Sequence, residues 1–490
     1  MMQSLLSHQR LADFSAFLAH RMGLHYPPER WGDLERAVTQ MAAELGFADA
    51  DACMRHFLSA QVERTQIETL ASYLTIGETY FFREPASFDA LATRVLPDLL
   101  EQRRAASHRH LRIWSAACST GEEAYSMAIL LHRLIPDIQH WNITLLATDI
   151  NPRSLRKAID GRYGEWSFRG IDPEIRRAYF TLRDGRWEIA PQIRRMVTFA
   201  YHNLAEDQYP AVHNNTNAMD IIFCRNVLMY FSAERARRVS AALQHSLVEG
   251  GWLVAAAVEG SSELFAPLVN SGAPGATIYR KQPAFTLPMV SPPPHPPTPL
   301  ASSPLLPEPP DPGLPPPSHQ VAGEQGQALL DEATRLYQKG ENAGAIALLL
   351  ADPALADDAR AQTLLARLYA NEGQLDLAAD WCRRALLIDR LSAERHYLLA
   401  MIRQECGDAR GATESLKRAL FLDPDFILAH VALAGLAKAE GKPSEARRCY
   451  RNALALLREC NSDDTLPEGD GLTAGRLVEI IRVASAEVRV

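Results

Sequence analysis

The sequence predicts a chain of three parts: an α/β core with a doubly wound parallel sheet, a helical region before it and an all-α repeat array after it. Short apolar runs alternate with helical stretches from about residue 76 to 283, which is typical of a parallel sheet covered by helices. A proline-rich segment follows at residues 288–317. Beyond it, small residues recur every 34 positions, as in stacked helix pairs.

Residues 1–75 are expected to form an N-terminal helical domain. In "HQRLADFSAFLAHRMGL" the apolar residues follow helical spacing, and "ADACMRHFLSAQVERTQIETLASYL" continues the pattern. Polar residues interrupt the N-terminus, so a signal peptide is not expected. No apolar run reaches the length of a membrane span, roughly eighteen residues.

Residues 76–283 are expected to form the α/β domain. Its clearest strand-like runs are "LRIWSAA", "NITLLATDI", "MDIIFCRN" and "GWLVAAAV", and such continuous apolar runs suit strands that are buried on both faces. Shorter strand-like pieces at about 160–199, including a turn and strand at "DGRWEIA", predict a small β-subdomain. The arginines of this stretch either meet an acidic partner helix or form a solvated basic face.

Residues 284–322 are expected to be a proline-rich linker. Proline removes backbone donors and fixes φ, so this segment predicts an extended polyproline II spacer rather than a packed core. It is also a possible SH3-like ligand, although a spacer is the expected role.

The region after the linker, residues 323–460, is interpreted as a tetratricopeptide array. Ala366, Ala400 and Ala434 are 34 residues apart, and the same spacing separates glycines at 373, 407 and 441. Small residues let antiparallel helices approach closely, and glycine ends the first helix of each pair. Such arrays bind a protein or peptide in a concave groove. Residues 461–490 are expected to be a tail or a capping helix.

Composition limits the possible functions. The net charge of −8 disfavours a nucleic-acid binder. The seven cysteines are scattered without metal-ligand spacing, which predicts reduced thiols in a cytoplasmic protein and no metal site. Cys118 and Cys224 are expected to be small buried side chains rather than nucleophiles.

Polar residues follow the predicted strands, where doubly wound sheets bind their ligands. The loop "CSTGEE" holds a single glycine, Gly121, followed directly by Glu122 and Glu123. A phosphate site would not place two carboxylates at the start of its helix. The glutamates therefore favour a cationic ligand or complement the helix dipole.

Asp149 ends the second apolar run, where an acidic side chain typically accepts hydrogen bonds from ribose hydroxyls. It is alternatively a cap of the helix that begins near Pro152. Ribose recognition beside carboxylates, without a phosphate loop, fits S-adenosylmethionine, which carries a ribose, an ammonium group and a sulfonium.

Five strings occur in order: "TIGETYFFREPASFDAL", "RIWSAACSTGEEAYSMAILL", "ATDINPRSLRKAIDGRY", "VTFAYHNLAE" and "DIIFCRNVLMYF". Together they closely resemble the CheR family of chemotaxis-receptor glutamate methyltransferases over nearly all of residues 10–282. The resemblance implies a Rossmann-like class I methyltransferase fold, S-adenosylmethionine as cofactor with S-adenosylhomocysteine as product, and glutamates on cytoplasmic helices of a methyl-accepting chemoreceptor as substrate. With its repeats, the chain resembles the WspC-type and FrzF-type members.

The resemblance also implies roles for single residues. Thr79 and Arg83 match positions that contact the cofactor, and Arg83 also matches a position near the substrate carboxylate. Glu122 matches the carboxylate that binds the methionine portion, whereas Glu123 is expected to serve the helix. Tyr230 matches an aromatic near the transferred methyl, or else is a packed aromatic. The other matching cofactor positions are Asp149 for the ribose, Asn203 and Leu204 on the adenine side, and Arg225 and Asn226.

Gly77 departs from the family pattern, which usually has Asn two residues before the threonine. Because glycine lacks the asparagine side chain, which both donates and accepts hydrogen bonds, we expect weaker cofactor binding at this position. Alternatively, Glu78 or a water molecule takes the place of the missing side chain. The chemistry itself is a positioning task, because a glutamate is already ionised near neutral pH and needs no general base. A cation such as Arg83 would hold the second carboxylate oxygen.

The sequence suggests two other functions. A scaffold that only senses the cofactor, with the repeats recruiting signalling partners, is the alternative to an enzyme. A nucleic-acid methyltransferase predicts a motif such as NPPY after the fourth strand, where this chain has "CRNVLMYF". The enzyme is expected in the cytoplasm, at receptor clusters.

Overall fold

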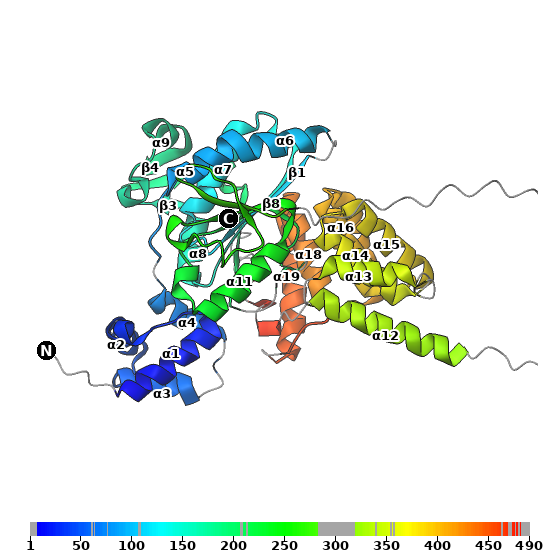
Figure 1. The fold of residues 1–490 in the computed structure, drawn as a ribbon, viewed down its shortest axis with the longest axis horizontal. Coiled ribbons are helices and arrows are strands. Elements are labelled where there is room, and N and C mark those ends of the chain that lie inside the picture. The colour runs from blue at the N-terminus through cyan, green and yellow to red at the C-terminus, as the bar shows by residue number, and fades with distance from the viewer. Residues whose placement is uncertain are drawn as a thin grey trace, which may run out of the picture.

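The computed structural model describes residues 7–59, 62, 64–75, 77–105, 109–205, 209–211, 214–282, 319–338, 341–352, 355, 358–461, 464–468, 473–475, 477–478 and 481. The proline-rich segment at 288–317 lies outside the described residues. Figure 1 shows the fold coloured from blue at the N-terminus to red at the C-terminus.

A seven-stranded sheet forms the centre of the α/β region. Its strand order is β6-β2-β1-β7-β8-β10-β9, and the first five strands are parallel. β10 and β9 continue the sheet as antiparallel edge strands. The bounds are β1 (His110–Ala116), β2 (Asn142–Asp149), β6 (Val197–Tyr201), β7 (Met219–Cys224), β8 (Leu247–Ala255), β9 (Val269–Asn270) and β10 (Thr277–Arg280). The predicted doubly wound sheet is confirmed, and the four apolar runs are β1, β2, β7 and β8.

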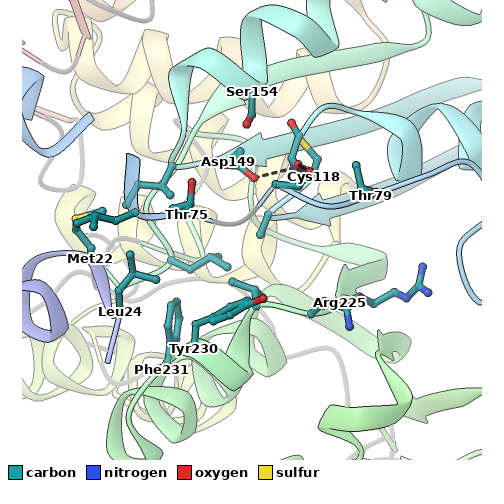
Figure 2. A pocket seen from close by; sticks show the side chains of 18 of the residues that line it. Met22, Leu24, Thr75, Thr79, Cys118, Asp149, Ser154, Arg225, Tyr230 and Phe231 are labelled. Carbon is teal, nitrogen blue, oxygen red and sulfur yellow. Dashed lines mark hydrogen bonds between the residues drawn. The ribbon is translucent and has the colours of Figure 1, made fainter. Parts of the chain in front are cut away.

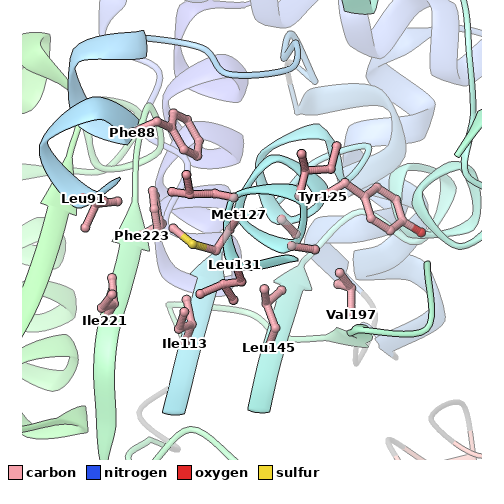
Figure 3. Packing of buried hydrophobic residues seen from close by; sticks show 14 of the residues in the cluster. Phe88, Leu91, Ile113, Tyr125, Met127, Leu131, Leu145, Val197, Ile221 and Phe223 are labelled. Carbon is pink, nitrogen blue, oxygen red and sulfur yellow. The ribbon is translucent and has the colours of Figure 1, made fainter. Parts of the chain in front are cut away.

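Helices cover both faces of this sheet because its strands carry apolar side chains on both sides. Every residue of β7 is buried. Figure 3 shows Met127 and Leu131 of α7 (Glu122–Leu134) against Ile113 and Phe223. The opposite face packs against α11 (Ala233–Ser246). The other helices of this region are α5 (Pro85–Ala90), the π-helical turn η2 (Leu91–Val95), α6 (Leu96–Ala105) and α8 (Pro152–Asp160).

Four helices precede the sheet and share an apolar core: α1 (His8–Met22), α2 (Trp31–Leu45), α3 (Ala50–Ser59) and α4 (Arg64–Leu74). The segment after α1 is hydrogen-bonded to the α/β region through backbone groups. The His25 N–H donates to the Tyr230 carbonyl at 2.8 Å, and Leu24 forms an antiparallel bridge with Phe231.

A three-stranded antiparallel sheet lies in the region where the β-subdomain is predicted. Its order is β3 (Arg162–Tyr163), β5 (Arg186–Ile189) and β4 (Phe180–Arg183), flanked by α9 (Pro173–Tyr179) and α10 (Pro191–Arg194). Asp184 and Gly185 have φ angles of 48° and 72°, the left-handed conformation that a two-residue hairpin turn requires. The turn expected at "DGRWEIA" is therefore present.

Helix pairs form the C-terminal region, as the 34-residue spacing predicts. They are α12 (His319–Gln338) with α13 (Asn342–Ala351), α14 (Ala359–Asn371) with α15 (Leu375–Ile388), α16 (Ala393–Glu405) with α17 (Ala409–Leu422), and α18 (Ile427–Ala439) with α19 (Pro443–Leu456). Gly373 and Gly407 follow α14 and α16 with φ of 73° and 81°. No helix in the described part of the chain has the length and apolar character needed to cross a membrane.

The repeat array packs against the edge of the sheet where the parallel strands begin (Figure 1). Asn142, the first residue of β2, donates through Nδ2 to the Glu405 carbonyl at 2.9 Å. The Glu405 carboxylate lies 3.8 Å from Arg112 of β1, and both side chains are 6% exposed. Asn217, before β7, donates to the Ala370 carbonyl at 3.5 Å.

Candidate active site

An open cavity with an empty volume of about 1120 Å³ lies at the carboxyl ends of the parallel strands, between the sheet and the N-terminal helices. In Figure 2, Met22, Leu24, Tyr230 and Phe231 lie across the cavity from Asp149 and Cys118. The predicted site residues on its wall are Gly77, Thr79, Arg83, Asp149, Asn203, Leu204, Arg225, Asn226 and Tyr230. The fold thus brings together residues far apart in the sequence.

Asp149 ends β2 and is held by backbone donors. Its carboxylate accepts from the Ser119 N–H at 2.7 Å and from the Asn151 N–H at 2.8 Å. Burial raises its pKa to about 6, although these hydrogen bonds oppose the shift. The helix cap of α8 is Asn151, which accepts from Arg153 and Ser154, so Asp149 is not needed for that role.

The loop between β1 and α7 positions Ser119 against Asp149. Gly121 has φ of 91°, and a Cβ there would lie 2.8 Å from the Ala158 Cβ. Ser119 donates through Oγ to the Gly77 carbonyl at 3.1 Å. A Cβ at Gly77 would lie 3.2 Å from that hydroxyl oxygen. The hydroxyl of Ser119 therefore lies close to the place where an asparagine side chain would leave the backbone.

The structure places Glu123, and not Glu122, on the cavity wall. The Glu122 carboxylate accepts from Thr120, in the loop before α7, at 2.6 Å and from Ser167, in the short helix η4 (Glu165–Phe168), at 2.9 Å. The methionine contact predicted for Glu122 is thus not supported by its position. Consecutive helix residues point about 100° apart, so only one of the two glutamates can face the cavity.

Arg225 connects Glu123 to the loop that carries Arg83. Its guanidinium lies 3.1 Å from Glu123 and 3.2 Å from Glu84, with the side chain 2% exposed. It also donates to the Arg83 carbonyl at 2.7 Å. Burial raises the pKa of Glu123, and the charge of Arg225 opposes this shift. Because its guanidinium is paired in this way, Arg225 orients the wall of the cavity.

The N-terminal helices close the adenine side predicted for Asn203 and Leu204. Asn203 donates through Nδ2 to the Arg21 carbonyl at 2.9 Å. Arg30 also lines the cavity, with its guanidinium carbon 6.0 Å from the ring centre of Tyr230. Asn203 therefore joins the sheet to α1, as well as facing the cavity.

Sequence reasoning missed Glu259, which holds the loop of Asn226 and Tyr230 in place. Its carboxylate accepts from the Asn226 N–H at 2.7 Å and from the Met229 N–H at 3.1 Å. Burial raises its pKa, while backbone hydrogen bonds from this loop lower it. A single glutamate after an apolar strand has no motif to reveal this role. Three residues of the N-terminal region were missed for the same reason: Met22, Leu24 and Arg30.

The two cysteines near the site remain in their thiol form. Burial and the neighbouring charge of Asp149 raise the pKa of Cys118 well above its usual value. Burial likewise raises the pKa of Cys224. Both side chains are buried, so neither is an activated nucleophile.

The geometry defines a nucleoside-binding site of a doubly wound α/β protein. Asp149 can accept hydrogen bonds from ribose hydroxyls, and the apolar side chains of Met22, Leu24 and Ile150 suit a purine ring. The Glu123 carboxylate lies on the wall of the cavity, where it is paired with Arg225. These residues fit S-adenosylmethionine, whose methionyl end carries positive charge.

Comparison with known proteins agrees with this class. The model of the CheR methyltransferase, SAM binding domain, matches residues 77–267, and a tetratricopeptide repeat model matches residues 359–390. The probable biofilm formation methyltransferase WspC of Pseudomonas putida is 30% identical over 448 residues, which cover 91% of this chain and 98% of that protein. A chemotaxis protein methyltransferase of Listeria innocua is 35% identical over 201 residues, 41% of this chain and 71% of that protein.

The chain therefore belongs to the CheR family of S-adenosylmethionine-dependent methyltransferases, in a form that carries a tetratricopeptide repeat domain. S-adenosylmethionine is its methyl donor.

Proposed function

We propose that this chain transfers a methyl group from S-adenosylmethionine to glutamate side chains on the cytoplasmic helices of a chemoreceptor. The products are a glutamate methyl ester and S-adenosylhomocysteine. The modified receptor would adapt the output of a chemosensory pathway, and the repeat array would bring the enzyme to its partner proteins at receptor clusters.

The observation that carries this proposal is the state of the arginines at the cavity. Arg225 is paired with Glu84 and Glu123, and Arg30 lies 3.5 Å from Asp33. Arg83 donates to the Glu78 carbonyl at 2.9 Å, and among the described residues no carboxylate pairs with it. Arg83 is thus a cavity cation available to a substrate carboxylate.

The remaining chemistry needs orientation more than proton transfer. An ionised glutamate attacks with one oxygen while Arg83 holds the other. The new bond joins that oxygen to the methyl carbon, and the electrons of the broken carbon–sulfur bond go to sulfur. Arg83 must bind loosely, because the carboxylate loses its charge in the transition state. Tyr230 borders the same space and would shape the path of the methyl group.

The test uses the full chain, labelled S-adenosylmethionine and the purified cytoplasmic fragment of a chemoreceptor from the same organism. We expect label on the receptor that base releases as methanol. Replacing Arg83 with Ala should lower the rate about 100-fold, in the range seen when one charge-stabilising group is removed from an active site. Arg94→Ala is the matched control, since Arg94 is exposed on the nearby turn η2, and its rate should be unchanged.

The outcomes separate the enzyme from the scaffold. Cofactor binding without a base-labile ester on any receptor of the organism would favour the cofactor-sensing scaffold. Equal rates for the Arg83 and Arg94 variants would remove the role given to Arg83, even if the ester forms.

A further inference from the structure

The first helices of the repeat pairs line one side of the array. α12 contacts α14, and α14 contacts α16, in addition to the partner within each pair. Neighbouring second helices in the described part of the array contact one another less. An array bends toward the side where its helices are closest, which places α12, α14 and α16 on the concave face on which such arrays bind ligands. The 34-residue repeat assigns the equivalent first helix, α18, to the same face.

The chain returns to this array after its last helix. Thr465 forms an antiparallel bridge with Thr473, and the Ala474 N–H donates to the Asp464 carbonyl at 2.9 Å. Ala474, Leu477 and Ile481 are buried in the apolar cluster of α18 and α19. We call residues 464–468 the C-terminal loop.

The C-terminal loop carries two side chains that anchor it to the array. Leu466 is 6% exposed and belongs to the same apolar cluster as Tyr397 of α16 and Leu433 of α18. Glu468 pairs with Arg367 of α14, and the two side chains are only 19% and 16% exposed. The loop thus reaches from the end of α19 back to a first helix two pairs earlier.

Comparing Arg367 with the equivalent residues of the later repeats shows which side chains a ligand in this groove would meet. The residues equivalent to Arg367 in the next two pairs, 34 and 68 positions later, are Met401 and Gly435. Met401 is partly buried beside the cluster that holds Leu466, and a Cβ at Gly435 would have no atom within 4 Å. One row of the concave face therefore presents a cation, an apolar side chain and open space.

We propose that the concave face is a peptide-binding groove that the C-terminal loop occupies, and that its external partner is a peptide with an apolar side chain followed two residues later by a carboxylate. The loop "LPE" at 466–468 has this spacing. Because the loop is tethered, its effective concentration is of the order of millimolar. A partner displaces it only when it binds more tightly or is held nearby. The inference does not depend on the proposed methyl transfer.

The probe is a fluorescently labelled synthetic peptide with the sequence of residues 461–475, and the readout is its anisotropy with the full chain. The double variant Leu466→Ser, Glu468→Ser should free the groove and bind the probe at least tenfold more tightly than the unaltered chain. Adding Arg367→Glu to this variant should abolish the gain. A probe with Lys in place of its glutamate should then bind again, because the charges are exchanged.

Two results would overturn the inference. One is a double variant with unchanged helix content, by circular dichroism, that binds the probe no better than the unaltered chain. The C-terminal loop would then be only a structural cap. If the double variant fails to fold, the milder Glu468→Gln is used, and an affinity for the probe equal to that of the unaltered chain would also reject the inference.

Discussion

Burial controls the charge of Asp149, the residue expected to hold the ribose. Its carboxyl is surrounded by protein and 8% exposed, which raises its pKa to about 6. The ionised form is the stronger acceptor, because its hydrogen bonds are charge-assisted and neither oxygen carries a proton. The cofactor should therefore bind the form that prevails above pH 6.

We predict that affinity for S-adenosylmethionine falls as the pH is lowered through about 6. Each further pH unit should weaken binding by up to about tenfold, because one proton must be released on binding. Titration calorimetry between pH 5 and 8 measures this. Asp149→Asn should bind weakly and lose the pH dependence, whereas Asp160→Asn, at the exposed end of α8, should retain it. A flat profile for the unaltered chain would contradict the prediction.

Single residues also show how far the sequence could identify the site. Asp149 was predictable because it ends an apolar strand, and strand ends meet at one edge of a parallel sheet. The choice between Glu122 and Glu123 was not, because it depends on how α7 is rotated against Tyr163, Phe199 and the small sheet. That rotation is fixed by packing between distant segments, which spacing in the sequence does not record.

At the scale of elements, the turn from β1 into α7 carries the site. Gly121 packs against α8 and β6, where a Cβ would lie 2.8 Å from Ala158 and 3.2 Å from the Phe199 ring. Gly46, after α2, has a similar positive φ of 78° but open space around it. The two glycines thus separate the cost of backbone conformation from the cost of crowding.

We predict that Gly46→Ala lowers the free energy of unfolding by about 1 kcal/mol, the cost of a left-handed Ala. Gly121→Ala should cost a further 1–3 kcal/mol, roughly the penalty of overpacking a core. It should also weaken cofactor binding, because the turn holds Ser119 against Asp149. Denaturant unfolding measures the free energy of unfolding of the two variants. Equal losses of stability for Gly46→Ala and Gly121→Ala would refute the crowding argument.

The helices and strands were predictable where a single sequence pattern dominates, either a continuous apolar run or a regular repeat. The runs that became β1, β2, β7 and β8 are apolar throughout, and the repeat helices follow a 34-residue spacing. The edge strands β9 and β10 were not predicted, since Val269–Asn270 and Thr277–Arg280 are short. The closure of α1 over the site rests partly on the His25 to Tyr230 backbone bond, and a backbone bond leaves no signature in side-chain identity.

At the scale of the whole molecule, the repeat array and the cofactor cavity lie at opposite edges of one sheet. The cavity is at the carboxyl ends of the strands, whereas Asn142 and Arg112 meet the array near the amino ends. Among the described residues, none from the array lines the cavity. Burial at this contact raises the pKa of Glu405, and the charge of Arg112 opposes the shift.

We predict that Glu405→Ala releases the array from the sheet without impairing the cofactor site. Arg112 would keep its bonds to Asn215 and Asn217 but lose its opposite charge, at a cost of about 2 kcal/mol or more for a buried contact. Small-angle scattering should show a larger radius of gyration, while affinity for S-adenosylmethionine stays within about twofold. Glu394→Ala is the control, because Glu394 is exposed on the same helix α16. An unchanged radius would mean that other contacts suffice for docking, and a large loss of affinity would show that the array supports the cavity through the strands.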